Sequence, residues 1–385
     1  MKKIKSITKK ILFIIIFPFF FLFIFIFRMK IGYLATEKIG DFCDISNNFY
    51  LSIKEKKMNK FGVLWFSSQS VCNWFLYKTV NRYCVILNSF ILHYSFEFLR
   101  NIGFNRFLID KTYMNSVIPK NFPLTNKYDS LISFNGVEKE IEKIEEKYQI
   151  SQNKIISFSV RSNQYHLNEE NKNSTRNYSI ENYLNIFKFL NEKKYKIFQI
   201  NSEKKNGEKK EINKYFLDPD IDKDNVIHSY IIDKSNLFIS SPSGPVGLAI
   251  VLQKPILLIN FTVWDHLMYC NPNFTRGIIF KKYKDLSTGK LINYRSVIEK
   301  KLYKKNYNED LKKDGIEVIE NNQDEIYNAV TEILFNETKD KINNDEEFEV
   351  LEKFKIFYKE HFKLDNINLN VSQYFLKNNK DLFFV

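Results

Sequence analysis

The chain has 385 residues, of which 44% are hydrophobic and 16% aromatic, and this composition excludes both a short peptide scaffold and a disordered chain. The 58 Lys and Arg residues against 45 Asp and Glu residues give a formal net charge of +13, and nearly all of the excess is lysine. Because nucleic-acid recognition favours the bidentate fork of arginine, we expect no nucleic-acid partner.

The chain begins with an apolar segment that is typical of a membrane anchor. Residues 11–27 (ILFIIIFPFFFLFIFIF) contain no polar side chain and follow five lysines. A helix of this length measures about 25 Å, at the short end for a hydrocarbon core of roughly 30 Å. No small-residue cleavage site follows, so residues 1–28 are predicted to be an uncleaved membrane anchor rather than a signal peptide.

Two arrangements of this anchor fit the sequence. The lysines before the apolar run outnumber the cations that follow it closely, and the positive-inside rule then puts the body of the protein outside the cytoplasm. If Pro18 instead breaks the helix, the segment dips into one leaflet. Both basic clusters then face anionic headgroups on the same side of the membrane.

Residues 29–150 are predicted to form an N-terminal α/β domain. Its expected elements are a strand over 29–35, a loop over 36–41, a helix over 42–56 and strands over 61–66 and 83–87. Apolar residues recur at helical spacing from Val137 to Tyr148 in a highly charged segment, which indicates a surface helix. We expect this helix to close the first domain near residue 150.

Residues 151–337 are predicted to form a second α/β domain. Strands are expected over 155–160, 195–200, 236–240 and 255–261, with helices over 180–193 and from the loop 241–247 to residue 253. Strands that alternate with helices in this way predict a parallel, doubly wound sheet. The charged tail, residues 338–385, is predicted to be helical and to pack back on the first domain.

The loop Ser-Pro-Ser-Gly-Pro-Val-Gly over 241–247 is the leading candidate for a binding site. It leads into a helix, whose N-terminus offers unpaired N–H groups and partial positive charge to a phosphate. Gly244 and Gly247 allow close approach to the backbone, and Ser241 and Ser243 add hydroxyl donors. An ordinary strand-to-helix turn has the same pattern, so both interpretations stay open. The spacing excludes a P-loop, a dinucleotide fingerprint and a hydrolase elbow.

Two arginines in this arginine-poor chain are further candidates. Arg161 follows the predicted strand 155–160, and Arg176 lies just before the predicted helix 180–193. Ligands of open α/β sheets bind at the carboxyl ends of the strands, where both arginines can clamp a diphosphate. The alternative for each is a surface salt bridge.

The sequence predicts no metal site. The cysteines (Cys43, Cys72, Cys84 and Cys270) form no C-x-x-C pair, so we expect free thiols and a reducing compartment. The aspartates at 218, 220, 222 and 224 suggest a calcium loop, but Lys223 and Ser229 occupy the positions that require Gly and Glu. We therefore expect a solvated acidic loop. The five histidines lack metal-binding spacing.

Four segments together resemble a known family. They are R-N-Y-S-I-E-N-Y (176–183), S-P-S-G-P-V-G-L-A (241–249), K-P-I-L-L-I-N-F-T (254–262) and D-G-I-E-V-I-E-N (314–321). The chain resembles a group of bacterial glycosyltransferases of the GT-B type, related in architecture to the lipopolysaccharide heptosyltransferases. The resemblance covers most of residues 30–335. In that group the first segment usually reads R-N-S-D-I-x-x-Y, from which Tyr178 and Ser179 depart.

The resemblance implies a GT-B fold, with two Rossmann-like domains facing a cleft. The second domain would bind a nucleotide-sugar donor through Arg161, Arg176, Ser241, Ser243, Gly244 and Gly247, and the first would bind the acceptor. The loop 36–41 resembles the L-G-D loop of heptosyltransferases, whose Asp is the general base, so Asp41 inherits that role; the group often has His at the matching place. Such enzymes typically need no metal, and the nucleotide sugar is a co-substrate rather than a cofactor.

The function so implied is transfer of a sugar to a surface-glycan acceptor, such as lipopolysaccharide or capsule. Because such acceptors are commonly lipid-linked at the cytoplasmic leaflet, we expect the body at the cytoplasmic face of a bacterial inner membrane, held by residues 11–27. One alternative is a non-catalytic, membrane-tethered scaffold of the same fold. Another is an anchored enzyme outside the cytoplasm, glycosylated at Asn173, Asn260 and Asn370.

Overall fold

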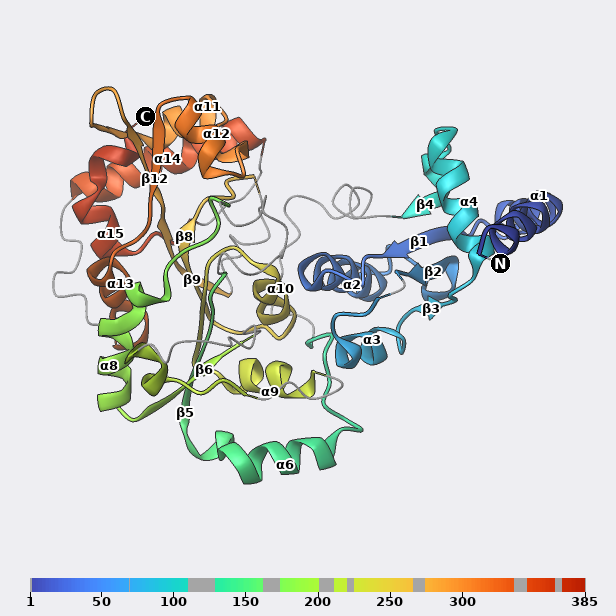
Figure 1. Cartoon of the computed structure of the whole chain (residues 1–385), viewed down its shortest axis with the longest axis horizontal. Coiled ribbons are helices and arrows are strands. Elements are labelled where there is room, and N and C mark those ends of the chain that lie inside the picture. Colours follow the sequence, from blue (N-terminus) through green and yellow to red (C-terminus); the bar gives the residue numbers. More distant parts are fainter. Residues whose placement is uncertain are drawn as a thin grey trace. The chain divides into compact units, whose positions relative to one another are not determined.

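The computed structural model describes residues 2–68, 70–109, 129–161, 174–200, 211–219, 225–265, 274–335, 345–363 and 369–384. The chain divides into two compact units (Figure 1). The first is Met1–Asn135 with Lys223–Asn225, and the second is Gly136–Asp222 with Val226–Val385. Both are α/β units built on a parallel sheet.

The first unit has a four-stranded parallel sheet in the order β3-β2-β1-β4. Its elements are α1 Lys2–Ile26, β1 Lys30–Leu34, α2 Ile39–Lys54, β2 Val63–Ser67, α3 Trp74–Val80, β3 Val85–Ile86, α4 Phe90–Asn101 and β4 Leu108–Ile109. Gly32 of β1 pairs with Trp65 of β2, and a Cβ at residue 32 would lie 2.4 Å from the indole. The fully buried tryptophan therefore requires glycine at this point of the strand.

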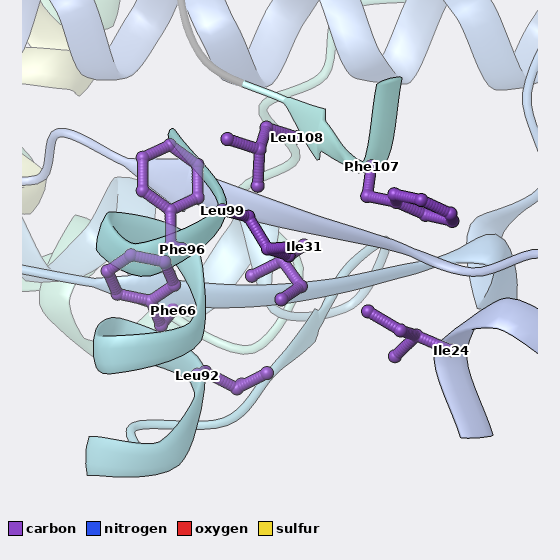
Figure 2. Close-up of a cluster of buried hydrophobic side chains, with 8 residues drawn as sticks. All are labelled: Ile24, Ile31, Phe66, Leu92, Phe96, Leu99, Phe107 and Leu108. Carbon is purple, nitrogen blue, oxygen red and sulfur yellow. The ribbon is translucent and has the colours of Figure 1, made fainter. Parts of the chain in front are cut away.

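The helix α1 does not end at Pro18 but continues to Ile26, so the proline break that the sequence allows is absent. Proline removes a single backbone donor, and a helix can tolerate this loss. Part of α1, Thr8–Ile26, is long and apolar enough to cross a membrane. Its Ile24, however, is fully buried in the core of the first unit, beside Ile31 of β1 and Phe107 (Figure 2).

The second unit has a five-stranded parallel sheet in the order β6-β5-β7-β8-β9. Its elements up to residue 280 are α6 Glu138–Tyr148, β5 Lys154–Ser159, α8 Leu184–Glu192, β6 Tyr195–Gln199, α9 Val226–Lys234, β7 Leu237–Ser240, α10 Gly244–Val251, β8 Ile256–Phe261 and β9 Thr275–Phe280. The strands β5, β7 and β8 are buried along almost their whole length, because both faces of a parallel sheet are covered.

The predicted boundary near residue 150 differs from the division of the structure. The helix α6 belongs to the second unit, where it packs against α9 and its Glu145 accepts a hydrogen bond from Tyr230 at 2.5 Å. A surface helix with a single buried position, Ile144, carries too little sequence information to show which unit it covers.

The last third of the chain completes the second unit. A small antiparallel sheet has the order β11-β10-β12. The elements are β10 Lys282–Asp285, β11 Leu291–Ile292, α11 Tyr294–Glu299, α12 Asn308–Lys313, β12 Ile316–Ile319, α13 Gln323–Phe335, α14 Asp345–Phe362 and α15 Gln373–Asn378. The tail was expected on the first domain, but it packs in the second unit: Phe354 contacts Trp264, Phe375 contacts Phe280, and Val371 bridges to Ile278.

Candidate functional site

The candidate site of the second unit lies at the point where the order of its sheet reverses. From β5 the chain continues to β6 on one side, whereas β7, β8 and β9 follow on the other. β5 and β7 are adjacent and parallel, and Ser159 is paired with Ser240 at their carboxyl ends. Such a switch point leaves a crevice between the two outgoing loops, and open α/β sheets bind their ligands there.

Arg176 connects one of these outgoing segments to the other. Its Nε and Nη2 atoms both donate to the main-chain carbonyl of Pro242, at 3.0 and 2.5 Å. The main-chain N–H of Tyr178 donates to the carbonyl of Arg161 at 3.2 Å. The structure therefore brings Arg161, Arg176 and the loop 241–247 together. The two bonds use two of the five guanidinium donors and fix the orientation of the group.

The loop 241–247 is mostly buried. The side chains of Ser241 and Ser243 are buried, and the hydroxyl of Ser243 forms a 2.9 Å hydrogen bond with that of Ser240. This differs from the expectation that both serines present their hydroxyls to a ligand. Gly244 is partly exposed and begins α10, for which Ser243 is the N-cap without a side-chain capping bond. Gly244 is thus the one residue of this loop that is open to a ligand, since Pro245, Val246 and Gly247 are buried.

Neither Gly244 nor Gly247 adopts a positive φ. The property that distinguishes glycine at these positions is therefore the missing side chain, rather than the backbone conformation. Pro245 lies in the first helical turn, where its missing N–H removes no intrahelical bond. The local sequence accounts for the start of α10 without any ligand. Evidence for a binding site must therefore come from the residues that pack around the start of this helix.

A buried lysine supports the segment that carries Arg176. Lys281 directly follows β9, is 3% exposed, and donates through Nζ to the carbonyl of Asn177 at 2.6 Å. Its Nζ also lies 3.9 Å from a carboxylate oxygen of Glu320. Burial lowers the pKa of Lys281 to about 8, and the carboxylate of Glu320 opposes this shift. Lys281 thus holds the residue next to Arg176 in place.

Glu320 and two asparagines extend this network. Glu320 accepts from the main-chain N–H of Ser179 at 3.0 Å and from Asn182 at 3.1 Å. Asn260 and Asn321 form reciprocal bonds, in which each main-chain N–H donates to the other side chain, at 2.6 and 2.8 Å. The four segments 176–183, 241–249, 254–262 and 314–321 therefore join in a single hydrogen-bonded network at this edge of the second unit.

Comparisons with known proteins give partial structural similarities. No family model matches the chain, and no curated protein matches it. Solved structures that are similar to part of the chain include the E. coli ADP-heptose LPS heptosyltransferase II, at 12% identity and a TM-score of 0.41, over 60% of this chain and 84% of that one. The glycosyl transferase family 9 protein from Veillonella parvula gives 10% and 0.37, over 60% and 80%. The E. coli heptosyltransferase WaaC with ADP gives 10% and 0.31, over 60% and 87%.

The buried Tyr178 is bonded to the sheet through its hydroxyl. Its hydroxyl donates to the carbonyl of Ser159 at the end of β5, at 2.5 Å, and accepts from the hydroxyl of Tyr183 at 2.9 Å. Burial raises the pKa of both phenols, so both remain protonated donors at neutral pH. Tyr178 therefore fastens the Arg176 segment to the sheet.

Asp41 lies in the first unit. The helix α2 begins at Ile39, earlier than expected, so Asp41 is in its first turn rather than in a loop. Thr36, five residues before Asp41 and two residues after the end of β1, is buried, and its hydroxyl bonds to that of Ser68 at 2.6 Å and donates to the carbonyl of Ser70 at 2.8 Å. A carboxylate in a first helical turn is favoured by the helix dipole. The role of Asp41 as a base stays a prediction.

The acidic run that was considered for a metal falls mostly outside the described residues, since Asp218 is described and the aspartates at 220, 222 and 224 are not. Among the residues that the structure describes, no cluster of three His, Cys, Asp or Glu side chains could hold a metal ion. Cys43, Cys72 and Cys84 are free thiols, and Cys270 is not described.

The sequence analysis missed the supporting residues Lys281, Glu320, Asn260 and Asn321. Signals for two of them were present. In the sequence, Lys281 follows the apolar run of residues 277–280, and Asn260 interrupts an apolar run. The structure adds that Asn260 has a φ of 51°. A polar residue in a left-handed conformation at the end of a buried strand points to a functional or bonded position. The partners of these residues depend on tertiary contacts.

Proposed function

We propose that the chain is a membrane-associated glycosyltransferase, which binds a nucleotide-sugar donor in its second unit and transfers the sugar to a glycan or glycolipid acceptor of the cell surface. The observation that carries this proposal is the bonding of Arg176 to the loop 241–247 at the switch point between β5 and β7. A crevice with a fixed arginine and a glycine at a helix N-terminus suits a diphosphate.

In this proposal the donor diphosphate lies against Gly244 and the first turn of α10, beside Arg176. The acceptor hydroxyl attacks the anomeric carbon, the bond from that carbon to the diphosphate oxygen breaks, and the nucleoside diphosphate leaves with the bonding electrons. Negative charge grows on the leaving oxygen during this step. A preorganised guanidinium and helix N–H groups stabilise that charge more than the charge of the bound donor, and this difference accelerates transfer.

Asp41 of the first unit is proposed as the base that takes the proton of the acceptor hydroxyl. Arg176, Arg161 and α10 supply the charge stabilisation that a divalent metal supplies in other transferases, so we propose a metal-independent reaction without a resident cofactor. We place the body at the cytoplasmic face of a bacterial inner membrane, where nucleotide sugars are made.

Ligand-dependent thermal stability tests the donor site directly. The full chain in detergent is heated with ADP, UDP, GDP, CMP and their sugars, and we expect one of these nucleotides to raise the melting temperature, because it binds the native state. Gly244→Val and Arg176→Ala should remove that shift. Arg295→Ala is the matched control, since this arginine is half-exposed on α11, where it pairs with Glu299 and lies 5.4 Å from the ring centre of Phe357.

A melting temperature that no nucleotide changes would favour the tethered scaffold instead. A shift that persists in both site variants would move the donor site elsewhere in the chain. These two outcomes are distinct, because the first rejects donor binding and the second rejects only its location.

A further inference from the structure

One face of α1 is part of the first unit. Phe13 of α1 lies 5.7 Å, ring to ring, from Tyr94 of α4, and Phe17 lies 5.0 Å from Phe98. Phe21 lies 5.5 Å from Phe107. These positions recur every fourth residue and therefore line one side of the helix. With Ile24 they dock α1 on the body over about 17 Å of its length.

The opposite face of α1 is apolar and exposed. Its exposed side chains include Ile15 at 60%, Phe19 at 74% and Ile26 at 62%. An apolar surface of this extent is unusual for a protein surrounded by water. Exposed apolar residues of the body at the end of α4 border the docked face of α1, because Phe98 contacts Phe17 and Phe104 contacts Phe21.

We name the exposed residues Phe98, Ile102 and Phe104 at the end of α4 the α4 patch. Cations stand at its border. The guanidinium of Arg106 lies 5.2 Å from the ring centre of Phe104, and that of Arg100 lies 5.9 Å from the ring of Phe96 and pairs with Glu97 at 2.6 Å. Aromatic rings bordered by arginines suit the boundary between lipid tails and anionic headgroups.

Lysines border α1 in the same way. Lys9 lies 6.0 Å from the ring centre of Phe90 at the start of α4, Lys10 is exposed, and Arg28 and Lys30 follow the C-terminus of α1. Cations therefore stand at both ends of the exposed apolar face. A helix that crossed the bilayer would have its two ends in different aqueous compartments, whereas a helix lying in one interface keeps both sets of cations at one layer of headgroups.

We propose that α1 lies along one leaflet of an anionic membrane without crossing it, and that the α4 patch enters the same leaflet. A crossing helix that kept its docked face would draw α4, with Glu97 and Arg100, into the hydrocarbon, where charged groups are costly. A crossing helix that left the body would expose the buried side chains around Ile24 to water. The in-plane arrangement avoids both costs, and it does not depend on the proposed transfer reaction.

Topology is tested with one epitope at each end of the full chain, expressed in bacteria. Protease is added to spheroplasts and to inverted membrane vesicles. The in-plane arrangement predicts that both epitopes are cleaved in the same preparation, because the chain never crosses the bilayer. Cleavage of the two epitopes in opposite preparations would overturn the proposal.

The α4 patch is tested by depth-dependent quenching. Bromine-labelled phosphatidylcholine should quench the tryptophan emission of the reconstituted variant Phe104→Trp by a larger fraction than that of the wild type. The control Phe348→Trp, at an exposed position on α14 of the second unit, should be quenched no more than the wild type. An unquenched Trp at residue 104 would overturn the entry of the patch. So would a stable dimer in detergent in which this residue is protected, since a second copy would then cover the surface.

The preference of the protein for anionic lipid is tested with two charge-reversal variants. Arg106→Glu should lower the partition of the full chain onto vesicles that contain phosphatidylglycerol by about fivefold or more, and should change partition onto phosphatidylcholine little. Arg295→Glu on α11 is the matched control. Equal loss on both kinds of vesicle, or no loss on either, would contradict the placement of Arg106 at the headgroups.

Discussion

The two units share an α/β plan but differ in where their unusual groups are gathered. In the second unit, polar groups from four distant segments meet by hydrogen bonds at the carboxyl edge of the sheet, around Arg176 and the start of α10. In the first unit, the unusual feature is an apolar surface made by α1 and the end of α4. This difference agrees with the two proposals, in which the second unit binds a charged ligand and the first unit binds a membrane.

The largest expected effect comes from breaking the polar edge of the second unit. Gly244→Val should abolish donor binding while the protein stays folded, because a side chain there blocks the approach to α10. Arg176→Ala should lower kcat by about 10² or more, the usual loss when one preorganised donor is removed. Arg176→Lys should restore little, since an ammonium cannot replace the bidentate fork. The rate of transfer of a labelled sugar, measured over a range of donor concentrations, gives kcat and the donor KM for each variant.

In these assays Arg295→Ala should behave as the wild type. If Arg176→Ala and Gly244→Val both transfer sugar at the wild-type rate with an unchanged donor KM, the polar edge of the second unit is structural only, and the contrast between the units disappears.

The next effect tests whether α1 belongs to the first unit. Ile24→Ala should destabilise that unit by about 2–4 kcal/mol, the cost of a buried large-to-small change. Ile15→Ala, which removes the same atoms from the exposed face of α1, should have almost no effect in detergent. Hydrogen exchange of the β1 and β2 amides measures the difference. If the two variants lose the same stability, α1 is linked to the first unit by the chain alone and does not pack in its core.

A smaller effect depends on pH and concerns the core of the second unit. His228 of α9 is buried, its ring nitrogens have no hydrogen-bond partner among the described residues, and burial lowers its pKa to about 4. The unfolded chain takes up a proton near pH 6.5 while the folded chain does not. Stability is therefore complete above pH 6.5 and is lost as the pH falls towards 4, by on the order of 3 kcal/mol at most.

His228→Leu should flatten this dependence. The measurement is urea unfolding of the second unit at pH 7 and at pH 4.5, compared between variant and wild type. His361→Leu is the control, because that ring lies at the exposed end of α14. Wild-type stability that is the same at both pH values would contradict the burial of a neutral imidazole.

The smallest expected effect is that of metal removal. Transfer should proceed unchanged in EDTA, since arginine side chains and helix N–H groups supply the positive charge at the diphosphate. Loss of turnover that manganese or magnesium restores would show that the polar edge of the second unit is incomplete without an ion. The acidic residues at 218–224 would then be the first to substitute.

Much of the fold could be predicted from the sequence because buried parallel strands are short apolar runs. Strands β1, β2, β5, β6, β7 and β8 were expected within a few residues of their observed limits. The two-residue strands β4 and β11 are too short to show a pattern, and β10 and β12 mix polar and apolar residues. The strand β9 was also missed, since its Thr-Arg-Gly start hides the buried run that follows.

The candidate site could be predicted in its parts but not in its connections. A conspicuous arginine and a Gly-Pro loop can be recognised in a sequence, but the bonds from Arg176 to Pro242 and from Lys281 to Asn177 exist only after the sheet has formed. Docking of α1 was hidden for a different reason. An apolar helix has the same composition whether lipid or protein covers it, so the sequence cannot show which face is buried.

The apolar surface made by α1 and the end of α4 is synthesised early, and this affects how the protein reaches a membrane. All residues of that surface and of the core beneath it lie before residue 110, whereas the polar network closes only with Asn321. Because domains fold as units during synthesis, N-terminal first, the first unit can settle on a membrane while most of the second is still untranslated. The ribosome itself would then be brought to the bilayer, and each second unit would be completed at the membrane surface.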